Sequence, residues 1–164
     1  MRPGAEQIVA AIRGWQAAAE SPLVVAIDGY GASGKTTIAW DVTVALDAAP
    51  VHMDDFFDDL TLSGDGRPMS RYYNWNALRR GTLEPTIAAA PALVLVEGVS
   101  SASPALADLI DRAVFVATPE PLRLERLHER IPDSEWDEDW LAEECLYFAG
   151  RPPESFDLVV PGAD

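Results

Sequence analysis

Residues 29–36 read Gly29-Tyr30-Gly31-Ala32-Ser33-Gly34-Lys35-Thr36 and match the phosphate-binding pattern GxxxxGK(S/T) at every fixed position. The run contains the only lysine of the chain. Residues 23–28 before it form an apolar run that is typical of a buried strand, and residues 36–46 after it have the apolar spacing of a helix. Strand, glycine-rich loop and helix follow in the order that the motif requires, so a chance glycine-rich turn is the less favoured interpretation.

This loop predicts a bound nucleoside triphosphate. Its glycines let the backbone turn tightly, so successive N–H groups and the positive end of the next helix converge on phosphate oxygens. Lys35 is expected to reach the β- and γ-phosphates, and the Thr36 hydroxyl to ligate Mg²⁺. We therefore predict ATP and Mg²⁺ as cofactors, with the nucleotide held by Gly29, Gly31, Ala32, Ser33, Gly34, Lys35, Thr36 and Thr37.

The length and net charge of the chain limit its expected domain organisation and its classes of partner. A chain of 164 residues that is 48% hydrophobic is long enough for one well-buried domain, which we expect to span residues 1–164. A net charge of −15 disfavours nucleic acid and anionic membranes as partners. The single Cys145 excludes an internal disulfide, and a buried thiol is favoured over a reactive one. With no signal sequence or membrane-spanning stretch apparent, we expect a cytoplasmic protein whose oligomeric state stays open.

Apolar segments and helix signals alternate along the chain. Strands are predicted at 23–28, 51–53, 92–96, 113–117 and 158–160. Helices are predicted at 5–19, at 36–46, from Ser103-Pro104 onward, at 118–130 and at 134–149, with a loop at 61–70. This alternation predicts a three-layer α/β fold with a parallel sheet covered on both faces.

Three acidic residues fall at the carboxyl ends of predicted strands, where such sheets gather their ligands: Asp28, Asp54 and Glu97. Asp54 suits a general base that binds the acceptor hydroxyl and takes its proton, and the alternative is a solvated acidic turn at 54–59. Glu97 suits a magnesium ligand, against a plain acid at the end of a strand. Asp28 is an outer-shell magnesium contact or an acid that holds the loop through local hydrogen bonds.

Three arginines at helical spacing follow the fourth predicted strand: Arg123, Arg126 and Arg130. They share one helix face, so they could form a lid that supplies cations to the transferring phosphoryl group. The alternative is salt bridging along the same helix with Glu120, Glu125 and Glu129.

Aromatic and amide side chains are concentrated in residues 71–76, which include Tyr73, Asn74 and Trp75. They suit stacking on a planar group and orienting hydroxyls, or else simple packing on the sheet. A second aromatic group at helical spacing, favoured as core over a substrate wall, comprises Trp136, Trp140 and Tyr147. His52 has no evident partner and is interpreted as structural.

Together these segments resemble the uridine kinase and phosphoribulokinase group of P-loop kinases, especially its small bacterial uridine kinase-like proteins. The matching segments are Ile27 to Thr37, His52 to Phe56, Tyr73 to Leu78, Val96 to Gly98 and Arg123 to Arg126.

The resemblance implies a five-stranded parallel sheet of the nucleoside and nucleotide kinase type and a lid at about 119–135. It also implies Asp54 as base, Glu97 at magnesium, Arg123 and Arg126 as catalytic cations, and an acceptor site that includes Phe56, Tyr73, Asn74, Trp75 and Arg130. Asn74 stands where uridine kinases commonly place an aspartate that contacts the sugar hydroxyls.

The sequence thus predicts ATP-dependent phosphoryl transfer to a hydroxyl of a small molecule, with a nucleoside as the leading acceptor. Another alcohol, such as a vitamin precursor, a sugar or an antibiotic, is the alternative within this class. A regulatory ATPase without an acceptor and a binding module without catalysis are the alternatives outside it. A GTPase of the common kind is excluded, because its Asn-Lys-x-Asp motif needs a second lysine.

Overall fold

A parallel sheet of five strands organises the chain, and its strand order is β2-β3-β1-β4-β5. The computed structural model describes residues 1–19, 22–58, 65–90, 92–130 and 138–162. The strands are β1 (Leu23–Asp28), β2 (Ala49–His52), β3 (Leu93–Glu97), β4 (Arg112–Ala117) and β5 (Leu158–Pro161). Every neighbouring pair runs parallel, which confirms the predicted α/β fold.

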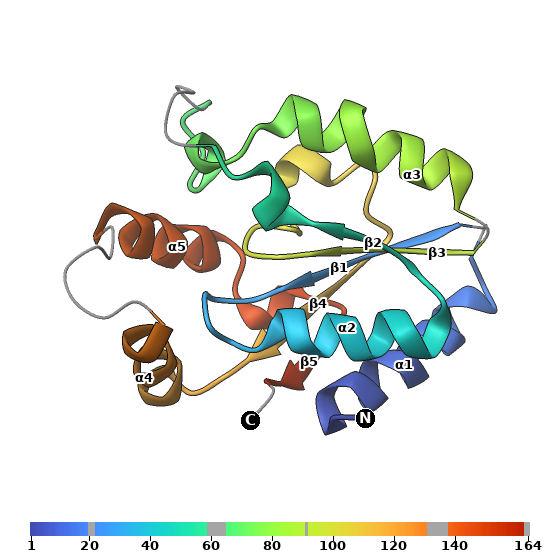
Figure 1. Cartoon of the computed structure of the whole chain (residues 1–164), viewed down its shortest axis with the longest axis horizontal. Helices are drawn as coiled ribbons and strands as arrows, with labels where there is room; N and C mark the ends of the chain where they lie inside the picture. The colour runs from blue at the N-terminus through green and yellow to red at the C-terminus, as the bar shows by residue number, and fades with distance from the viewer. Residues whose placement is uncertain (20–21, 59–64, 91, 131–137, 163–164) are drawn as a thin grey trace.

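Helices cover both faces of this sheet (Figure 1). On one face α1 (Pro3–Gln16) and α2 (Lys35–Leu46) pack against Val25 and Ile27 of β1. The alternate residues Val24 and Ala26 face the second core cluster, to which the segment 69–83 and α5 (Glu138–Gly150) contribute. Because both faces are buried, β1 is apolar over its first five residues and ends in the buried carboxylate of Asp28.

The carboxyl ends of the strands lie at one edge of the sheet, beside α5 and α4 (Glu120–Arg130) (Figure 1). The register places His52 of β2 opposite Glu97 of β3, and Ile27 of β1 opposite the same glutamate. The polar residues that end β1, β2 and β3 are therefore neighbours at the edge where the glycine-rich loop begins.

One helical prediction needs correction, and one helical segment was not predicted. The helix expected from Ser103-Pro104 is a single 3₁₀ turn, Pro104–Leu106, although the Ser103 side chain does accept a hydrogen bond from the Ala105 N–H. A helical segment that the sequence analysis missed runs from Ala77 to Leu83 with π-type bonding and continues as α3 (Glu84–Ala89). Gly81 and Pro85 interrupt the helical pattern of the sequence. The wider π-type turn before Pro85 accommodates a proline nitrogen that has no N–H to donate.

The prediction of a buried Cys145 is wrong, because this side chain is exposed. Glu144, Tyr147 and Phe148 are the buried residues of α5, and the position directly after Glu144 is turned away from their face. The predicted helix start at Ser134 lies outside the described residues. No helix in the described ranges has the length and apolar composition needed to cross a membrane.

Gly98, directly after β3, provides a test of how tightly this edge is packed. Its φ of +137° disfavours a side chain, and an added Cβ would overlap the Cβ of Met53. We expect Gly98→Ala to lower the free energy of unfolding by about 2–3 kcal/mol in urea denaturation. Gly14→Ala is the control, since a Cβ on that residue of α1 meets no described atom within 4 Å, and it should raise stability by about 0.5–1 kcal/mol. Equal effects of the two changes would contradict this packing.

Candidate functional site

The loop between β1 and α2 has the backbone of an anion-binding nest. Gly34 caps α2 in the left-handed region at φ 85°, and Ala32 also has a positive φ of 59°. An added Cβ at Gly29 would lie 2.8 Å from the Val116 carbonyl oxygen, so β4 packs directly on the start of the loop. The positive φ values at Ala32 and Gly34 turn successive N–H groups of the loop toward one concave side. The positive end of α2 adds to the attraction for an anion at the same point.

Lys35 lies at the first turn of α2 with only 8% of its surface exposed. Its Nζ donates a hydrogen bond to the Tyr30 carbonyl oxygen at 3.2 Å, which holds the ammonium group over the loop. The Ser33 Oγ is buried and has no hydrogen-bond partner in the described part of the chain. A buried ammonium and an unpaired hydroxyl beside a nest of N–H groups fit the polyphosphate of a nucleotide.

Thr36 and Glu97, the two expected magnesium ligands, are in contact. The Thr36 Oγ1 donates to Glu97 Oε2 at 3.2 Å, and the other carboxylate oxygen lies 2.8 Å from His52 Nδ1. Oxygen donors of this kind fit Mg²⁺. The interpretation of His52 as lacking a partner is corrected, because β2 and β3 are neighbours and their last residues pair across the sheet.

A cavity of about 590 Å³ opens beside the loop. One wall carries the predicted nucleotide-binding residues Gly31, Ala32, Gly34, Lys35, Thr36 and Thr37. Another part of the lining is formed by Asp54, Phe57, Tyr72, Val99, Leu127, Arg130 and Trp140. The phosphate loop and Asp54 therefore line the same cavity. Asp54 lies in the 3₁₀ turn Met53–Phe56 that follows β2, and it is exposed.

The aromatic part of the cavity differs from the sequence expectation by one residue on each segment. Phe57 and Tyr72 line the cavity, with ring centroids 6.1 Å apart and nearly parallel planes, whereas Phe56 and Tyr73 had been expected there. Tyr73 is fully buried and its hydroxyl donates to the Val99 carbonyl oxygen at 2.9 Å. Phe57 and Tyr73 form an isolated antiparallel β-bridge, so the segments that carry Phe57 and Tyr72 lie side by side.

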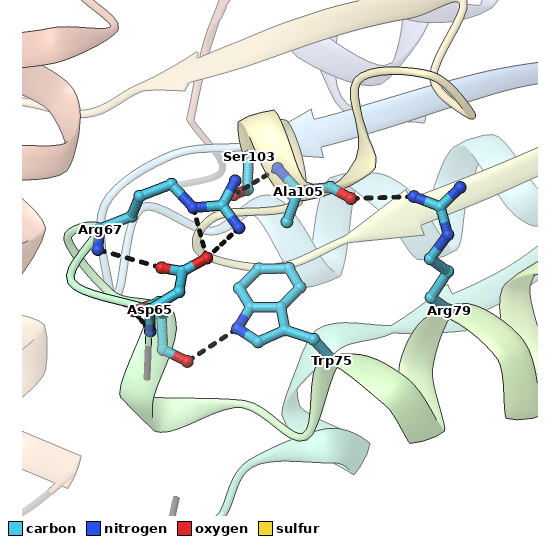
Figure 2. Close-up of polar contacts among 7 residues, drawn as sticks. Asp65, Arg67, Trp75, Arg79, Ser103 and Ala105 are labelled. Atoms are coloured by element: carbon cyan, nitrogen blue, oxygen red, sulfur yellow. Dashed lines mark hydrogen bonds and ion pairs between the residues drawn. The ribbon is translucent and has the colours of Figure 1, made fainter. Parts of the chain in front are cut away.

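Asn74 and Trp75 bind their own segment and are not among the described residues that line the cavity. The Trp75 Nε1 donates to the Ser70 carbonyl oxygen at 2.7 Å (Figure 2). The Asn74 Oδ1 accepts the Ala77 N–H at 3.0 Å and so caps the helical segment that follows. Figure 2 also shows Arg79 bound to the Ala105 carbonyl oxygen, which ties this segment to the turn after β3.

The three arginines of α4 occupy different environments. Arg123 is buried; its guanidinium lies over the Tyr30 ring at 4.8 Å, and its Nη1 is 3.5 Å from the Gly31 carbonyl oxygen. Arg130 is exposed and lines the cavity, while Arg126 is half-buried and is not among the described lining residues.

The acidic partner of Arg123 is Glu144 of α5, at 3.7 Å. Within the described ranges no ion pair joins the three arginines to Glu120, Glu125 or Glu129. The described residues therefore show one contact between α4 and α5 in place of the alternative interpretation, salt bridging along α4. Glu144 was not predicted as a site residue, because helical periodicity does not indicate which loop a helix will contact.

Asp28 is completely buried and accepts four hydrogen bonds. Its Oδ1 accepts the N–H groups of Gly29 and Ser100 at 2.8 and 3.0 Å, and its Oδ2 accepts the Ala102 N–H and the Tyr147 hydroxyl at 3.1 and 2.7 Å. Burial raises the pKa of Asp28, and its hydrogen bonds and Lys35 act in the opposite direction. This geometry supports the interpretation that Asp28 holds the loop by local hydrogen bonds.

Two aromatic residues of α5 contribute differently to the site. Tyr147 is buried, as expected for a core residue, and Trp140 both packs on the core and lines the cavity. The Trp140 ring lies 4.8 Å from that of Tyr72, centroid to centroid. Trp136 lies outside the described residues. Trp140 thus lines the cavity as well as packing on the core.

Comparison with solved structures shows that the chain shares its fold with several proteins that are described as kinases. A "Possible Uridine Kinase" from Bacillus stearothermophilus matches with a TM-score of 0.60 and 16% identity, over 94% of this chain and 99% of that one. Shikimate kinase from Bacteroides thetaiotaomicron has a TM-score of 0.54 and 15% identity, over 85% and 86%. A gluconokinase from Sinorhizobium meliloti 1021 also has a TM-score of 0.54 and 15% identity, over 89% and 86%. No family model and no curated protein matches the sequence.

The hydrogen bonds of Asp28 generate a stability prediction. Asp28→Ala leaves three backbone N–H groups and a tyrosine hydroxyl without their acceptor, so we expect it to lower the free energy of unfolding by about 3 kcal/mol or more. Tyr147→Phe removes one of the four donors and should cost about 1 kcal/mol. Chemical denaturation of the two variants measures both changes. A loss at Asp28→Ala no larger than that at Tyr147→Phe would contradict the anchoring role.

Proposed function

We propose that the protein transfers the terminal phosphoryl group of ATP to a hydroxyl of a small molecule. The observation that carries this proposal is the shared cavity, in which a phosphate-binding loop and the carboxylate of Asp54 line the same space. The aromatic wall and the carboxylate beside the loop suit the binding of an acceptor and the removal of its hydroxyl proton. The fold of small-molecule kinases supports the same conclusion by analogy.

In this proposal the loop and the strand ends hold the donor. The N–H groups of the loop and Lys35 bind the phosphates, while Thr36 and Glu97 hold Mg²⁺. When bound, the metal ion neutralises charge on the β- and γ-phosphate oxygens. His52, at hydrogen-bond distance from Glu97, orients the carboxylate, which leaves its second oxygen beside Thr36.

Asp54 is the proposed general base. Its position after β2 places its carboxylate in the cavity lining with the loop, so an acceptor hydroxyl bound between them can approach the transferring phosphorus. The Asp54 carboxylate accepts the hydroxyl proton as the new oxygen–phosphorus bond forms. Its exposure on the cavity side is consistent with a group that meets a diffusing substrate.

The arginines have separate roles in this proposal. Arg130 is the cation best placed to contact the transferring phosphoryl group, because it lines the cavity. Arg123 lies behind the loop on Gly31 and Tyr30, from where it can reach phosphate only by leaving Glu144. Arg126 keeps its predicted catalytic role only if α4 rotates or closes further over the cavity.

The aromatic wall favours an acceptor with a planar or apolar surface. The rings of Phe57, Tyr72 and Trp140 contact one another, with centroids 4.8 to 6.1 Å apart. A nucleoside, with its flat base and sugar hydroxyls, remains the leading acceptor, and another alcohol such as a vitamin precursor, sugar or antibiotic remains the alternative. Asn74 is engaged in its own cap, so the sugar hydroxyls would be read by other groups.

An acceptor panel tests the function directly. ADP release from Mg-ATP is measured with and without nucleosides, sugars and pantothenate, and we expect one class of compound to stimulate turnover at least about tenfold. Lys35→Ala should abolish the stimulated rate, which excludes a contaminating kinase. Turnover that no acceptor changes would favour a regulatory ATPase, and nucleotide binding without any turnover would favour a binding module.

Asp54 and its neighbour Asp55 form a matched pair for testing the general base. Both are exposed in the same turn, but only Asp54 is among the described residues that line the cavity. Asp54→Asn should lower kcat by at least ~10²-fold and leave the affinity for a non-hydrolysable ATP analogue nearly unchanged. Asp55→Asn should stay within about twofold of the wild type in both quantities. A similar loss of kcat in the two variants would remove Asp54 from the proposed role.

A further inference from the structure

Two adjacent glutamates of α5 hold the two sides of the cavity in the same way. Glu143 accepts the Met69 N–H at 2.8 Å and pairs with Arg71 at 2.7 Å, on the segment that leads to Tyr72. Glu144 accepts the Gly31 N–H of the phosphate loop and pairs with Arg123. Each carboxylate therefore binds one backbone N–H and one arginine, Glu143 on the side of the aromatic wall and Glu144 on the side of the loop.

The contacts of Glu144 are buried from solvent. It is 1% exposed, and Arg123 beside it is 6% exposed. Gly31 is held from both directions, because its N–H donates to Glu144 while its carbonyl oxygen lies 3.5 Å from Arg123 Nη1. Burial raises the pKa of Glu144, whereas the Gly31 N–H, Arg123 and Lys35 oppose that rise. Breaking such a buried pair by removing one partner costs stability.

The partners of Glu144 are also the groups that bind phosphate. A loop N–H and an arginine guanidinium are the usual hydrogen-bond donors to phosphoryl oxygens. The Glu144 carboxylate already accepts the Gly31 N–H and pairs with Arg123, so it uses the donors that a phosphate would use. Any polyphosphate that enters the cavity meets this negative charge behind Gly31. Arg123 has five N–H donors on a planar group, so it can turn from a carboxylate to a phosphate without leaving the neighbourhood of the loop.

We propose that Glu144 is an internal counter-anion of the phosphate loop, which holds Arg123 while the donor site is empty and releases Arg123 to the phosphates when a nucleotide binds. This inference rests on the proposed nucleotide-binding function. Glu144 is a positioning residue, since it acts through Arg123 and Gly31. Its charge lowers donor affinity and stabilises the nucleotide-free protein.

The same exchange connects the donor to the acceptor wall. Trp140 lies one turn before Glu144 on α5 and lines the cavity, and Glu143 fixes the segment that carries Tyr72. Loss of the ion pair between α4 and α5 removes one of the contacts that hold α5 beside the acceptor wall.

The test compares Glu144→Gln with Glu143→Gln, which weakens a more exposed arginine pair on the side of the cavity away from the loop. Affinity for magnesium AMP-PNP is measured by calorimetry, and stability by thermal unfolding without nucleotide. We expect Glu144→Gln to unfold at a lower temperature and yet to bind AMP-PNP about fivefold more tightly. Glu143→Gln should also lose stability but keep the wild-type affinity. A purely structural Glu144 would lose both stability and affinity, and that result would overturn the proposal.

A second measurement leaves Glu144 unchanged and covers the case in which Glu144→Gln fails to fold. The guanidinium NMR resonances of Arg123, assigned by their loss in Arg123→Lys, are followed in the wild type as magnesium AMP-PNP is added. A shift that saturates with the calorimetric affinity supports the exchange of partner, and unchanged resonances at saturation overturn it. Absence of AMP-PNP binding to the wild type would instead overturn the proposed function itself.

Discussion

The carboxylate of Asp28 is the point on which the geometry of this edge of the sheet depends. It ends the central strand β1, and its four hydrogen bonds reach the first residue of the loop, the turn after β3 and Tyr147 of α5. Because it has no contact with water, each of these donors depends on it for its partner. The phosphate loop, the strand end that carries Glu97 and the helix that carries Trp140 and Glu144 are thus fixed relative to one another by one side chain.

The parts of the fold that follow from local pattern could be predicted from the sequence. The loop motif, the apolar runs of β1 and β3 and the alternation with helices determine a parallel sheet, and a parallel sheet brings Asp54 and Glu97 to the edge where the loop begins. The segment 77–89 was missed because Gly81 and Pro85 obscure a helix that tertiary packing nevertheless forms. In this segment the low helix propensity of glycine and proline opposes helix formation. Burial of the Leu78 and Leu83 side chains in the core stabilises the helix nevertheless.

The side-chain detail of the site was harder to predict for a physical reason. Phe56 and Tyr73 were expected at the cavity, whereas Phe57 and Tyr72 line it, because a sequence pattern does not determine which of two neighbouring aromatic residues turns toward a cavity. The contacts of Glu144 and His52 join residues far apart in the chain and depend on how α5 and β2 pack. A single sequence contains no local signal for either contact.

The solitary lysine of the chain has a chemical consequence. Lys35 lies at the end of the loop, buried and tethered to the Tyr30 carbonyl oxygen, and every other permanent side-chain cation is an arginine. An acylating group delivered by a nucleotide analogue would meet a single ε-amine in this sequence, with a terminal α-amine as the other primary amine. An adduct on the peptide that contains Lys35 therefore reports an occupied loop, without mutagenesis or a substrate being known.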